Sequence, residues 1–315
     1  MDARRAVLAP KARSAADALL PLMRFGFRTL SAVSVGLAAR VAQRVWFTPP
    51  RPRLSPASAA FLGTGTRADI LVHGRKVAVW SWGEGPAVLL VHGWGGFAAQ
   101  FQSFVEPLVR AGYRAVAFDA PSHGASGPSR HGRRQSTFFE FADALVELAR
   151  RSEPVAGVIA HSGGGTSVAW AVRRGWRVPA AVFIAPMGSP IAYQRVFADA
   201  LGIPDAVMER FKSNVERRLQ FQWQDLEVAE VSRFADTPPL LIVHDRDDRE
   251  TSWRESQNVV AAWPDARLRT TTGLGHNRIL REAGVIAESI EFLDHPERSE
   301  GSGVPSREAR MAGGS

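Results

Sequence analysis

Short apolar runs recur through the middle of the chain, and they do not alternate with polar positions. Five of them span residues 87–91, 115–118, 155–160, 180–185 and 240–243, and a further short strand is expected near 267–271. Each is followed by polar residues or glycine, which is typical of parallel strands covered on both faces. Apolar positions at helical spacing lie between or after them, over 98–111, 137–150, 167–175, 252–263 and 278–293. This alternation predicts an α/β fold with a doubly wound, mostly parallel sheet.

Two further apolar runs precede this region and are joined differently. Residues 70–72 and 77–80 flank the polar tetrapeptide His73-Gly74-Arg75-Lys76. Two short runs around a glycine-containing turn predict an antiparallel hairpin. We expect this hairpin at the edge of the sheet, ahead of the parallel strands.

A long insertion separates the runs at 180–185 and 240–243. Within it, residues 193–201, 206–219 and 226–234 have helix-like spacing. An insertion of this length predicts a helical lid over about residues 188–236 or a packing appendage. Its aromatic residues Phe197 and Trp223 are candidates for lining a substrate pocket. The alternative is that these rings form core beneath the lid helices.

The N-terminal part of the chain has a different pattern. Residues 19–47 place apolar side chains at helical spacing, with Arg40 and Arg44 on another face; the apolar positions are Leu30, Val33, Leu37, Val41 and Val45. This predicts an amphipathic helix that ends at Thr48-Pro49-Pro50. A Pro-, Arg- and Ser-rich linker follows. The predicted organisation is therefore an arm with its linker (1–58), a main domain (59–294) and a disordered, polar tail (295–315).

The net charge of +8 is confined to the arm. Residues 1–53 contain ten arginines and lysines but only Asp2 and Asp17 as acidic residues, so they account for the whole excess. A neutral main domain argues against a nucleic-acid partner. Four interpretations of the arm remain open. They are contact with an anionic membrane surface through residues 19–47, packing against the main domain, a transit peptide that is removed, and a dimer contact.

Composition narrows the class of protein further. The chain has 315 residues, of which 45% are hydrophobic and 22% charged, as in soluble globular proteins, and it has no cysteine. No stretch approaches the roughly 20 uncharged apolar residues of an ordinary membrane span. The lack of cysteine excludes disulfides, thiolate metal sites and a cysteine nucleophile. We expect a cytoplasmic protein, with membrane association through the N-terminal helix as the alternative.

Ser162 lies where the run at 155–160 ends, and Gly163-Gly164-Gly165 follows it. The sequence around it predicts a buried strand, a sharp turn and a helix, with the serine at the turn. A side chain at such a corner needs small residues two positions away, and these are Ala160 and Gly164. This is the nucleophile-elbow pattern with alanine in place of its first glycine.

Other polar residues follow the remaining strands, and the carboxyl ends of parallel strands meet at one edge of a sheet. An aspartate of the 245–248 cluster follows one strand, and His276 follows the last. A nucleophilic serine needs a base to take its proton and a carboxylate to orient that base. The order Ser162, aspartate, His276 supplies all three.

With these motifs in place, the chain resembles the α/β-hydrolase superfamily over about residues 68–294. His92-Gly93-Trp94-Gly95 is similar to the family's HG-x loop. The segment Asp119-Ala120-Pro121-Ser122-His123-Gly124-Ala125-Ser126 is similar to its D-x-P-G-H-G-x-S turn, with Ser122 where glycine is usual. The family's G-x-x-D turn places Asp248 in the acid position and Asp245 in that of the glycine. The family histidine maps to His276.

The resemblance implies a serine hydrolase that cleaves a carboxylic ester or a related acyl compound through an acyl-enzyme. Ser162 is the nucleophile, His276 the base and Asp248 the residue that holds the imidazole, while the backbone N–H groups of Trp94 and Gly163 form the oxyanion hole. No cofactor or metal is implied, and the partner is a small-molecule acyl substrate. The alternatives are an acyltransferase or thioesterase with the same triad, and a non-catalytic member that binds a small molecule.

Several neighbouring polar residues are predicted to have structural roles only. His92, His123 and His161 lie inside motifs whose catalytic histidine is elsewhere, so we expect them to make hydrogen bonds in turns. Asp245 and Asp247 are predicted to be solvated turn residues. The glycines after His92 lack the spacing and the lysine of a phosphate-binding loop.

Overall fold

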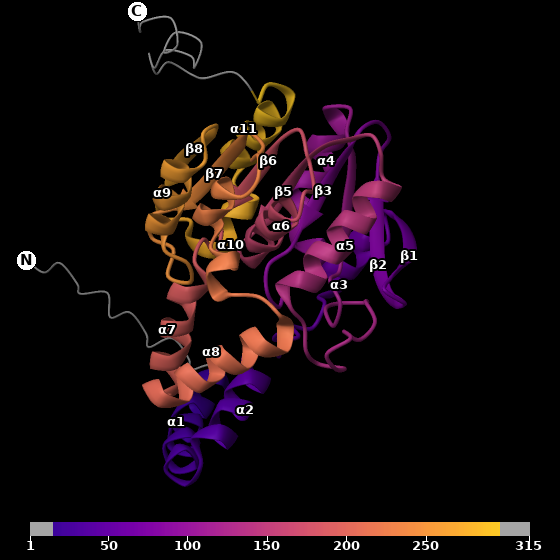
Figure 1. Ribbon diagram of the computed structural model, residues 1–315. Helices are drawn as coiled ribbons and strands as arrows, with labels where there is room; N and C mark the ends of the chain where they lie inside the picture. The colour runs from indigo at the N-terminus through magenta and orange to yellow at the C-terminus, as the bar shows by residue number, and fades with distance from the viewer. Residues whose placement is uncertain (1–14, 297–315) are drawn as a thin grey trace, which may run out of the picture.

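The computed structural model of the protein describes residues 15–296, with side chains from residue 19 onward. One sheet of eight strands, in the order β1-β2-β4-β3-β5-β6-β7-β8, forms its centre (Figure 1). The strands are β1 (Thr66–Val72), β2 (Arg75–Trp82), β3 (Ala87–Val91), β4 (Arg114–Phe118), β5 (Val155–His161), β6 (Ala181–Ile184), β7 (Leu240–Asp245) and β8 (Ala266–Thr271). β1 and β2 form an antiparallel hairpin, β2 pairs antiparallel with β4, and all other pairs are parallel. The predicted α/β fold and its N-terminal hairpin are confirmed.

Helices cover both faces of this sheet. The α-helices of the main domain are α3 (Pro56–Leu62), α4 (Gln102–Arg110), α5 (Phe138–Arg151), α6 (Gly163–Arg173), α9 (Trp253–Ala262), α10 (Gly275–Arg278) and α11 (Ala283–Asp294). α5, α6 and α9 contribute to the core on one face, and α3, α4 and α11 to the core on the other. Leu89 of β3 belongs to the first core and Leu90 to the second, and both are fully buried. The central strands therefore read as continuous apolar runs because successive side chains enter different cores.

A helical cap lies over one end of the sheet; it consists of α1 (Ala15–Val33), α2 (Val35–Trp46), α7 (Pro190–Leu201) and α8 (Asp205–Leu219). Figure 1 shows α1 and α2 at the far end of the cap, beyond α7 and α8. The insertion thus supplies the predicted lid helices. The segment predicted as a third lid helix, 226–234, instead forms a short 3₁₀ helix, η3 (Val228–Arg233), which another one, η2 (Trp223–Leu226), precedes.

The N-terminal helix differs from the prediction in two ways. It is broken at Ser34, whose hydroxyl accepts a hydrogen bond from the Leu37 N–H and so caps α2. The side of α2 that packs on the rest of the cap is Ala38, Ala39 and Ala42, all fully buried, rather than the leucine and valine stripe. Small side chains let α2 approach closely, which the larger ones would prevent.

The stretch predicted as a linker lies against the main domain. The guanidinium of Arg51 donates hydrogen bonds to the carbonyl oxygens of Ser122, at 3.1 Å, and Arg133, at 2.8 Å. Pro50 lies so close to Gly95 that a Cβ there would come within 2.4 Å of the proline ring. α3 follows, capped by the Ser55 hydroxyl, so only the residues between α2 and α3 are without regular structure.

Two of the predicted segments extend beyond residues 15–296. The basic residues Arg4, Arg5, Lys11 and Arg13 of the arm lie outside the described residues, and so do residues 297–315 of the predicted tail. None of the described helices is both long enough and apolar enough to cross a bilayer.

Candidate active site

Ser162 occupies a sharp turn between β5 and α6. Its backbone has φ 53° and ψ −126°, a conformation that L-residues rarely adopt. The turn is held by close packing: a Cβ at Gly164 would lie 2.5 Å from the carbonyl oxygen of Val91, and one at Gly93 would lie 2.8 Å from the Ser162 Cβ. Only glycine fits at these two positions. The predicted strand, turn and helix are therefore present, with the serine at the strained corner.

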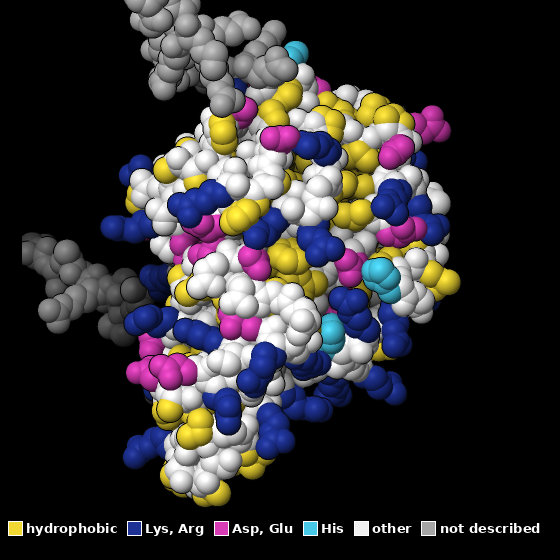
Figure 2. Space-filling view, viewed as in Figure 1, with side chains coloured by type: hydrophobic (Ala, Val, Ile, Leu, Met, Phe, Trp, Pro, Cys, Tyr) yellow, Lys and Arg dark blue, Asp and Glu magenta, His cyan; other side chains and the backbone are white. Residues whose placement is uncertain are grey.

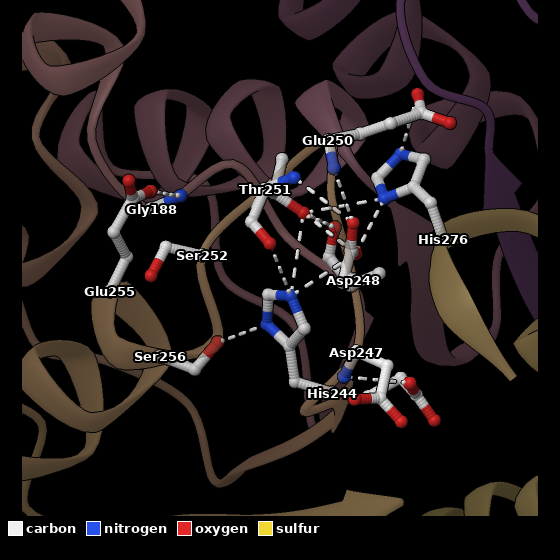
Figure 3. Close-up of polar contacts among 12 residues, drawn as sticks. Gly188, His244, Asp247, Asp248, Glu250, Thr251, Ser252, Glu255, Ser256 and His276 are labelled. Atoms are coloured by element: carbon white, nitrogen blue, oxygen red, sulfur yellow. Dashed lines mark hydrogen bonds and ion pairs between the residues drawn. The ribbon is translucent and has the colours of Figure 1, made fainter. Parts of the chain in front are cut away.

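His276 lines the same cavity as Ser162. Figure 3 shows that Asp248 holds its imidazole ring. Its Nδ1 is 2.7 Å from Asp248 Oδ2, and the side chain of Asp248 is fully buried. A carboxylate accepts this bond, so Nδ1 carries the proton and Nε2 of a neutral ring has a free lone pair. Ser162 and His276 line one cavity, although no hydrogen bond joins their side chains within the described structure. Such bonds often form only when substrate is present.

Asp248 is fixed by several donors besides His276. Its Oδ1 accepts from the backbone N–H of Glu250, at 2.8 Å, and of Thr251, at 3.1 Å. Its Oδ2 also accepts from the Thr251 hydroxyl at 3.0 Å and lies 3.3 Å from His244 Nε2. Burial by itself would raise the pKa of Asp248, but the bonds from His244 and His276 outweigh it and lower that pKa below its ordinary value. Asp248 is therefore an anion at neutral pH.

The two neighbouring aspartates face the loop that carries His276. Asp245 Oδ2 accepts from the Thr271 hydroxyl at 2.7 Å and from the Leu274 N–H at 3.0 Å. Asp247 accepts from the Gly273 N–H at 2.8 Å. Asp245 is fully buried, so it is not the solvated turn residue that the sequence predicts. It connects β7 to the loop after β8 and so positions the candidate base.

His92 and His123 are buried and accept hydrogen bonds from the turns around the site. His92 Nε2 accepts from the Ala120 N–H at 3.0 Å, and His123 Nε2 accepts from the Gly95 N–H at 3.1 Å. Burial lowers the pKa of both rings, that of His123 to about 3, with a smaller contribution there from His92. Both histidines therefore stay neutral and brace the loop after β3 against the turn after β4.

His161 precedes the candidate nucleophile and touches the candidate base. Its Nε2–H donates to the His276 carbonyl oxygen at 2.9 Å, and its Nδ1 accepts from the Gln100 amide at 2.6 Å. Burial, and then the proximity of His276, lower the pKa of His161 to about 3. The neutral ring thus connects the nucleophile loop to the backbone of His276.

Trp94 and Gly163 bring two backbone N–H groups to the site. Neither N–H donates a hydrogen bond to any described residue, and Gly163 is the first residue of α6. Both residues adjoin the Ser162 region, since Trp94 follows Gly93 and Gly163 follows the serine. Free N–H groups are suited to bind a developing oxyanion, and that of Gly163 also lies at the positive end of the α6 dipole.

A cavity of about 570 Å³ connects the serine to the cap. Its floor includes Gly93, Ser162 and His276, and its walls are mostly apolar side chains of the cap and the loops; those from the cap include Val45, Trp46, Tyr193 and Phe197. Pockets of this volume suit a ligand of drug or short lipid size.

The two lid aromatics singled out from the sequence lie in different places. Phe197 lines the cavity and packs edge-on against Trp46, with ring centroids 5.1 Å apart. Trp223 is almost fully buried, stacks on Phe211 and is absent from the cavity lining. The geometry therefore supports substrate contact for Phe197, whereas Trp223 belongs to the core of the cap.

Three residues near the site were not predicted from the sequence. His244, at the end of β7, is fully buried between Ser256 and Asp248. Thr251 reaches Asp248 from the following turn, and Glu250 places Oε2 at 3.8 Å from His276 Nε2. All three lie within the segment from β7 to α9, so proximity to Asp248 along the chain could have indicated them. Within residues 15–296, no group of three or more His, Asp or Glu side chains is arranged to hold a metal ion.

Comparisons with known proteins identify the family that this chain resembles. A model described as "Alpha/beta hydrolase family" matches residues 88–288. The chain is 30% identical to a non-heme haloperoxidase of Rhodococcus erythropolis over 267 residues, which are 70% of this chain and 97% of that protein. It is 33% identical over 148 residues to the non-heme chloroperoxidase CPO-A1 of Kitasatospora aureofaciens, covering 46% of this chain and only about half (52%) of that protein.

A solved structure extends the likeness in fold. A membrane phospholipase A, described as a bacterial virulence factor, matches with a TM-score of 0.58 and 16% identity, over 89% of this chain and 100% of that one. At this identity the match concerns the fold alone.

Proposed function

The chain belongs to the alpha/beta hydrolase family, and from that premise we propose that it is a serine hydrolase that cleaves a carboxylic ester through an acyl-enzyme. The observation that carries the proposal is the bond of 2.7 Å between the buried Asp248 and Nδ1 of His276, a residue that lines the same cavity as Ser162. A binding protein would not need a strained serine, a free imidazole nitrogen and a buried carboxylate around one cavity.

In the first half-reaction, Ser162 Oγ attacks the ester carbonyl carbon while His276 Nε2 takes the hydroxyl proton. Asp248 holds the imidazole in the required tautomer and stabilises the imidazolium. The N–H groups of Trp94 and Gly163 bind the oxyanion of the tetrahedral intermediate. The ester C–O bond then breaks, the leaving alkoxide takes the proton from His276, and the acyl group remains on Ser162.

In the second half-reaction, water replaces the alcohol. His276 removes a proton from the water, which attacks the acyl carbonyl carbon, and the second intermediate collapses to release the acid and restore Ser162. An alcohol or amine that replaced this water would turn hydrolysis into acyl transfer. The same steps apply to a thioester, so the choice of substrate depends on the cavity rather than on the triad.

Labelling with a fluorophosphonate tests the proposal directly. We expect wild-type protein to react at Ser162 and to hydrolyse p-nitrophenyl acetate, and Ser162→Ala and His276→Ala to lose nearly all turnover with unchanged melting temperatures. Their losses should not add in the double variant, because the two residues act as one unit. A folded wild type that never reacts would favour the non-catalytic binder, and full turnover in Ser162→Ala would refute the assignment of the nucleophile.

A second candidate activity comes from the names of the two sequence relatives, which are haloperoxidases. If hydrogen peroxide replaces water on the acyl-enzyme, Ser162 is released and the acyl group leaves as a peracid. The peracid can oxidise bromide to hypobromite and return to the carboxylic acid. This reaction predicts bromination of an organic acceptor that requires acetate, peroxide, bromide and Ser162 together. Bromination that persists in Ser162→Ala would exclude this route.

A further inference from the structure

The outer end of the helical cap exposes large apolar side chains. On α1, Leu22, Phe25 and Val33 are 65%, 68% and 78% exposed, and on α2, Leu37 and Val41 are 43% and 38% exposed. Figure 2 shows hydrophobic side chains gathered at this end of the molecule, over α1 and α2. A cluster of this kind on a folded surface marks an interaction site.

These side chains border an apolar groove between α1 and α2. The groove has a volume of about 540 Å³ and is lined by residues that include Met23, Phe27, Leu30 and Val41. Its lining also includes Val45, which lines the cavity above Ser162 as well. The groove and the cavity are therefore neighbours that meet at the Val45 side chain.

Positively charged side chains lie beside this surface. Arg28, Arg40 and Arg44 are exposed on α1 and α2, and no acidic residue lies between residues 18 and 53. None of these three arginines takes part in an ion pair with another described residue. Figure 2 shows Lys and Arg side chains beside the hydrophobic ones at this end of the molecule. An apolar face with unpaired cations beside it matches the acyl and headgroup layers of an anionic bilayer.

We propose that the α1–α2 surface docks on an anionic phospholipid bilayer and that the acyl chain of a membrane ester reaches Ser162 along the groove that ends at Val45. This inference rests on the proposed hydrolase function and specifies its substrate class as a lipid ester. A protein partner would be recognised by hydrogen-bonding groups set among the apolar ones, and on this surface the polar side chains are chiefly arginines. Headgroup phosphates are satisfied by such cations without a fixed geometry.

Binding is measured by sedimentation of the full-length protein with vesicles of phosphatidylglycerol and phosphatidylcholine in equal parts. We expect binding at low salt, release as ionic strength rises, and little binding to phosphatidylcholine alone. Leu22→Ser should weaken binding roughly tenfold, because the leucine side chain that enters the bilayer is lost. The matched control is Leu71→Ser on β1, because Leu71 is also 65% exposed, and it should bind as the wild type does.

The charged part of the surface is tested separately. Each basic residue near an anionic surface is worth about fivefold in affinity, so the triple variant Arg28→Gln, Arg40→Gln, Arg44→Gln should bind roughly 150-fold more weakly. A control triple of exposed arginines on the main domain, Arg110→Gln, Arg150→Gln and Arg177→Gln, should bind normally. Equal losses in both triples would mean that net charge alone drives adsorption, which would overturn the docking surface.

Activity separates docking from the hydrolase proposal. Leu22→Ser should lose the rate on an ester embedded in vesicles and keep the rate on soluble p-nitrophenyl acetate, since it lies outside the catalytic cavity. Ser162→Ala should bind vesicles normally and cleave neither ester, so failure of catalysis and failure of docking are distinguishable. Wild-type protein that does not bind vesicles, or a vesicle-free dimer that Leu22→Ser dissociates, would overturn the membrane proposal.

Discussion

Replacement of Asp248 by asparagine should remove most of the activity without unfolding the protein. The reason is the set of donors around the carboxylate. Oδ1 accepts two backbone N–H groups, from Glu250 and Thr251, so the amide oxygen of an asparagine must take that place. Its NH₂ group then faces His276 Nδ1, where Oδ2 now accepts at 2.7 Å.

This geometry forces the wrong tautomer on His276. An NH₂ group can only donate, so Nδ1 must lose its proton and Nε2 must carry one. A protonated Nε2 cannot take the proton of Ser162. The analogous change in other triads costs about 10⁴ in kcat, or about 5.5 kcal/mol of transition-state stabilisation, and we expect a similar loss here.

The assay is kcat/KM on p-nitrophenyl acetate together with a thermal melt. Asp247→Asn is the matched control, because the exposed Asp247 accepts only a backbone N–H and should lose less than about threefold. A loss below tenfold in Asp248→Asn, or an equal loss in Asp247→Asn, would refute the assignment of the acid.

Three further predictions concern the surroundings of the site. Because His161 has a pKa of about 3 when folded and 6.5 when unfolded, the unfolded chain binds the extra proton and stability falls as pH drops below 6.5. His161→Gln should remove this contribution. The variant is then less stable than the wild type, and the difference in their free energies of unfolding in urea should be about 2 kcal/mol smaller at pH 5 than at pH 7. Parallel curves of unfolding free energy against pH for the two proteins would contradict this prediction. Phe197→Ala should weaken the preference for long acyl chains and leave the turnover of the acetate ester intact. Trp223→Ala should instead cost about 3–5 kcal/mol of stability and lower the melting temperature. A change in chain-length selectivity that occurs only in Trp223→Ala would reverse this assignment. Glu250→Gln should remove the repulsion between the Glu250 carboxylate and an anionic substrate near His276. In steady-state kinetics, KM should fall roughly fivefold for an ester that carries a carboxylate and stay unchanged for a neutral ester. An equal change for both esters would exclude an electrostatic role.

The strands and the strand-end residues could be predicted because burial on both faces leaves a clear pattern. Leu89 and Leu90 enter separate cores, so β3 is apolar at every position, and its predicted bounds match the structure. The same rule located the loop that carries Ser162, because β5 before it is apolar and largely buried. The positive φ of 64° at Ser122 also explains why glycine is usual at that position.

The pattern of hydrophobic and polar positions could not predict contacts between distant segments of the chain. Hydrophobicity along α2 indicated the valines and leucines as the packed face, but Ala38, Ala39 and Ala42 form it because close approach to the cap favours small side chains. Asp245 looked like a turn residue because its partners, Thr271 and Leu274, lie on another strand and loop. Periodicity reports how polar a position is, and it carries no information on which distant segment covers it.

The division of the cap between two distant segments affects how the protein is made. α2 ends at Trp46, and its neighbour α8 begins at Asp205, roughly 160 residues later. At about 5–20 residues per second, a ribosome needs roughly ten to thirty seconds to supply that neighbour. During this interval the alanine face of α2 lacks its native neighbour α8, and the pair of helices α1 and α2 is not covered by the rest of the cap. The nascent chain therefore presents a basic, apolar helix pair to chaperones and lipid surfaces well before the chemistry of the site can exist.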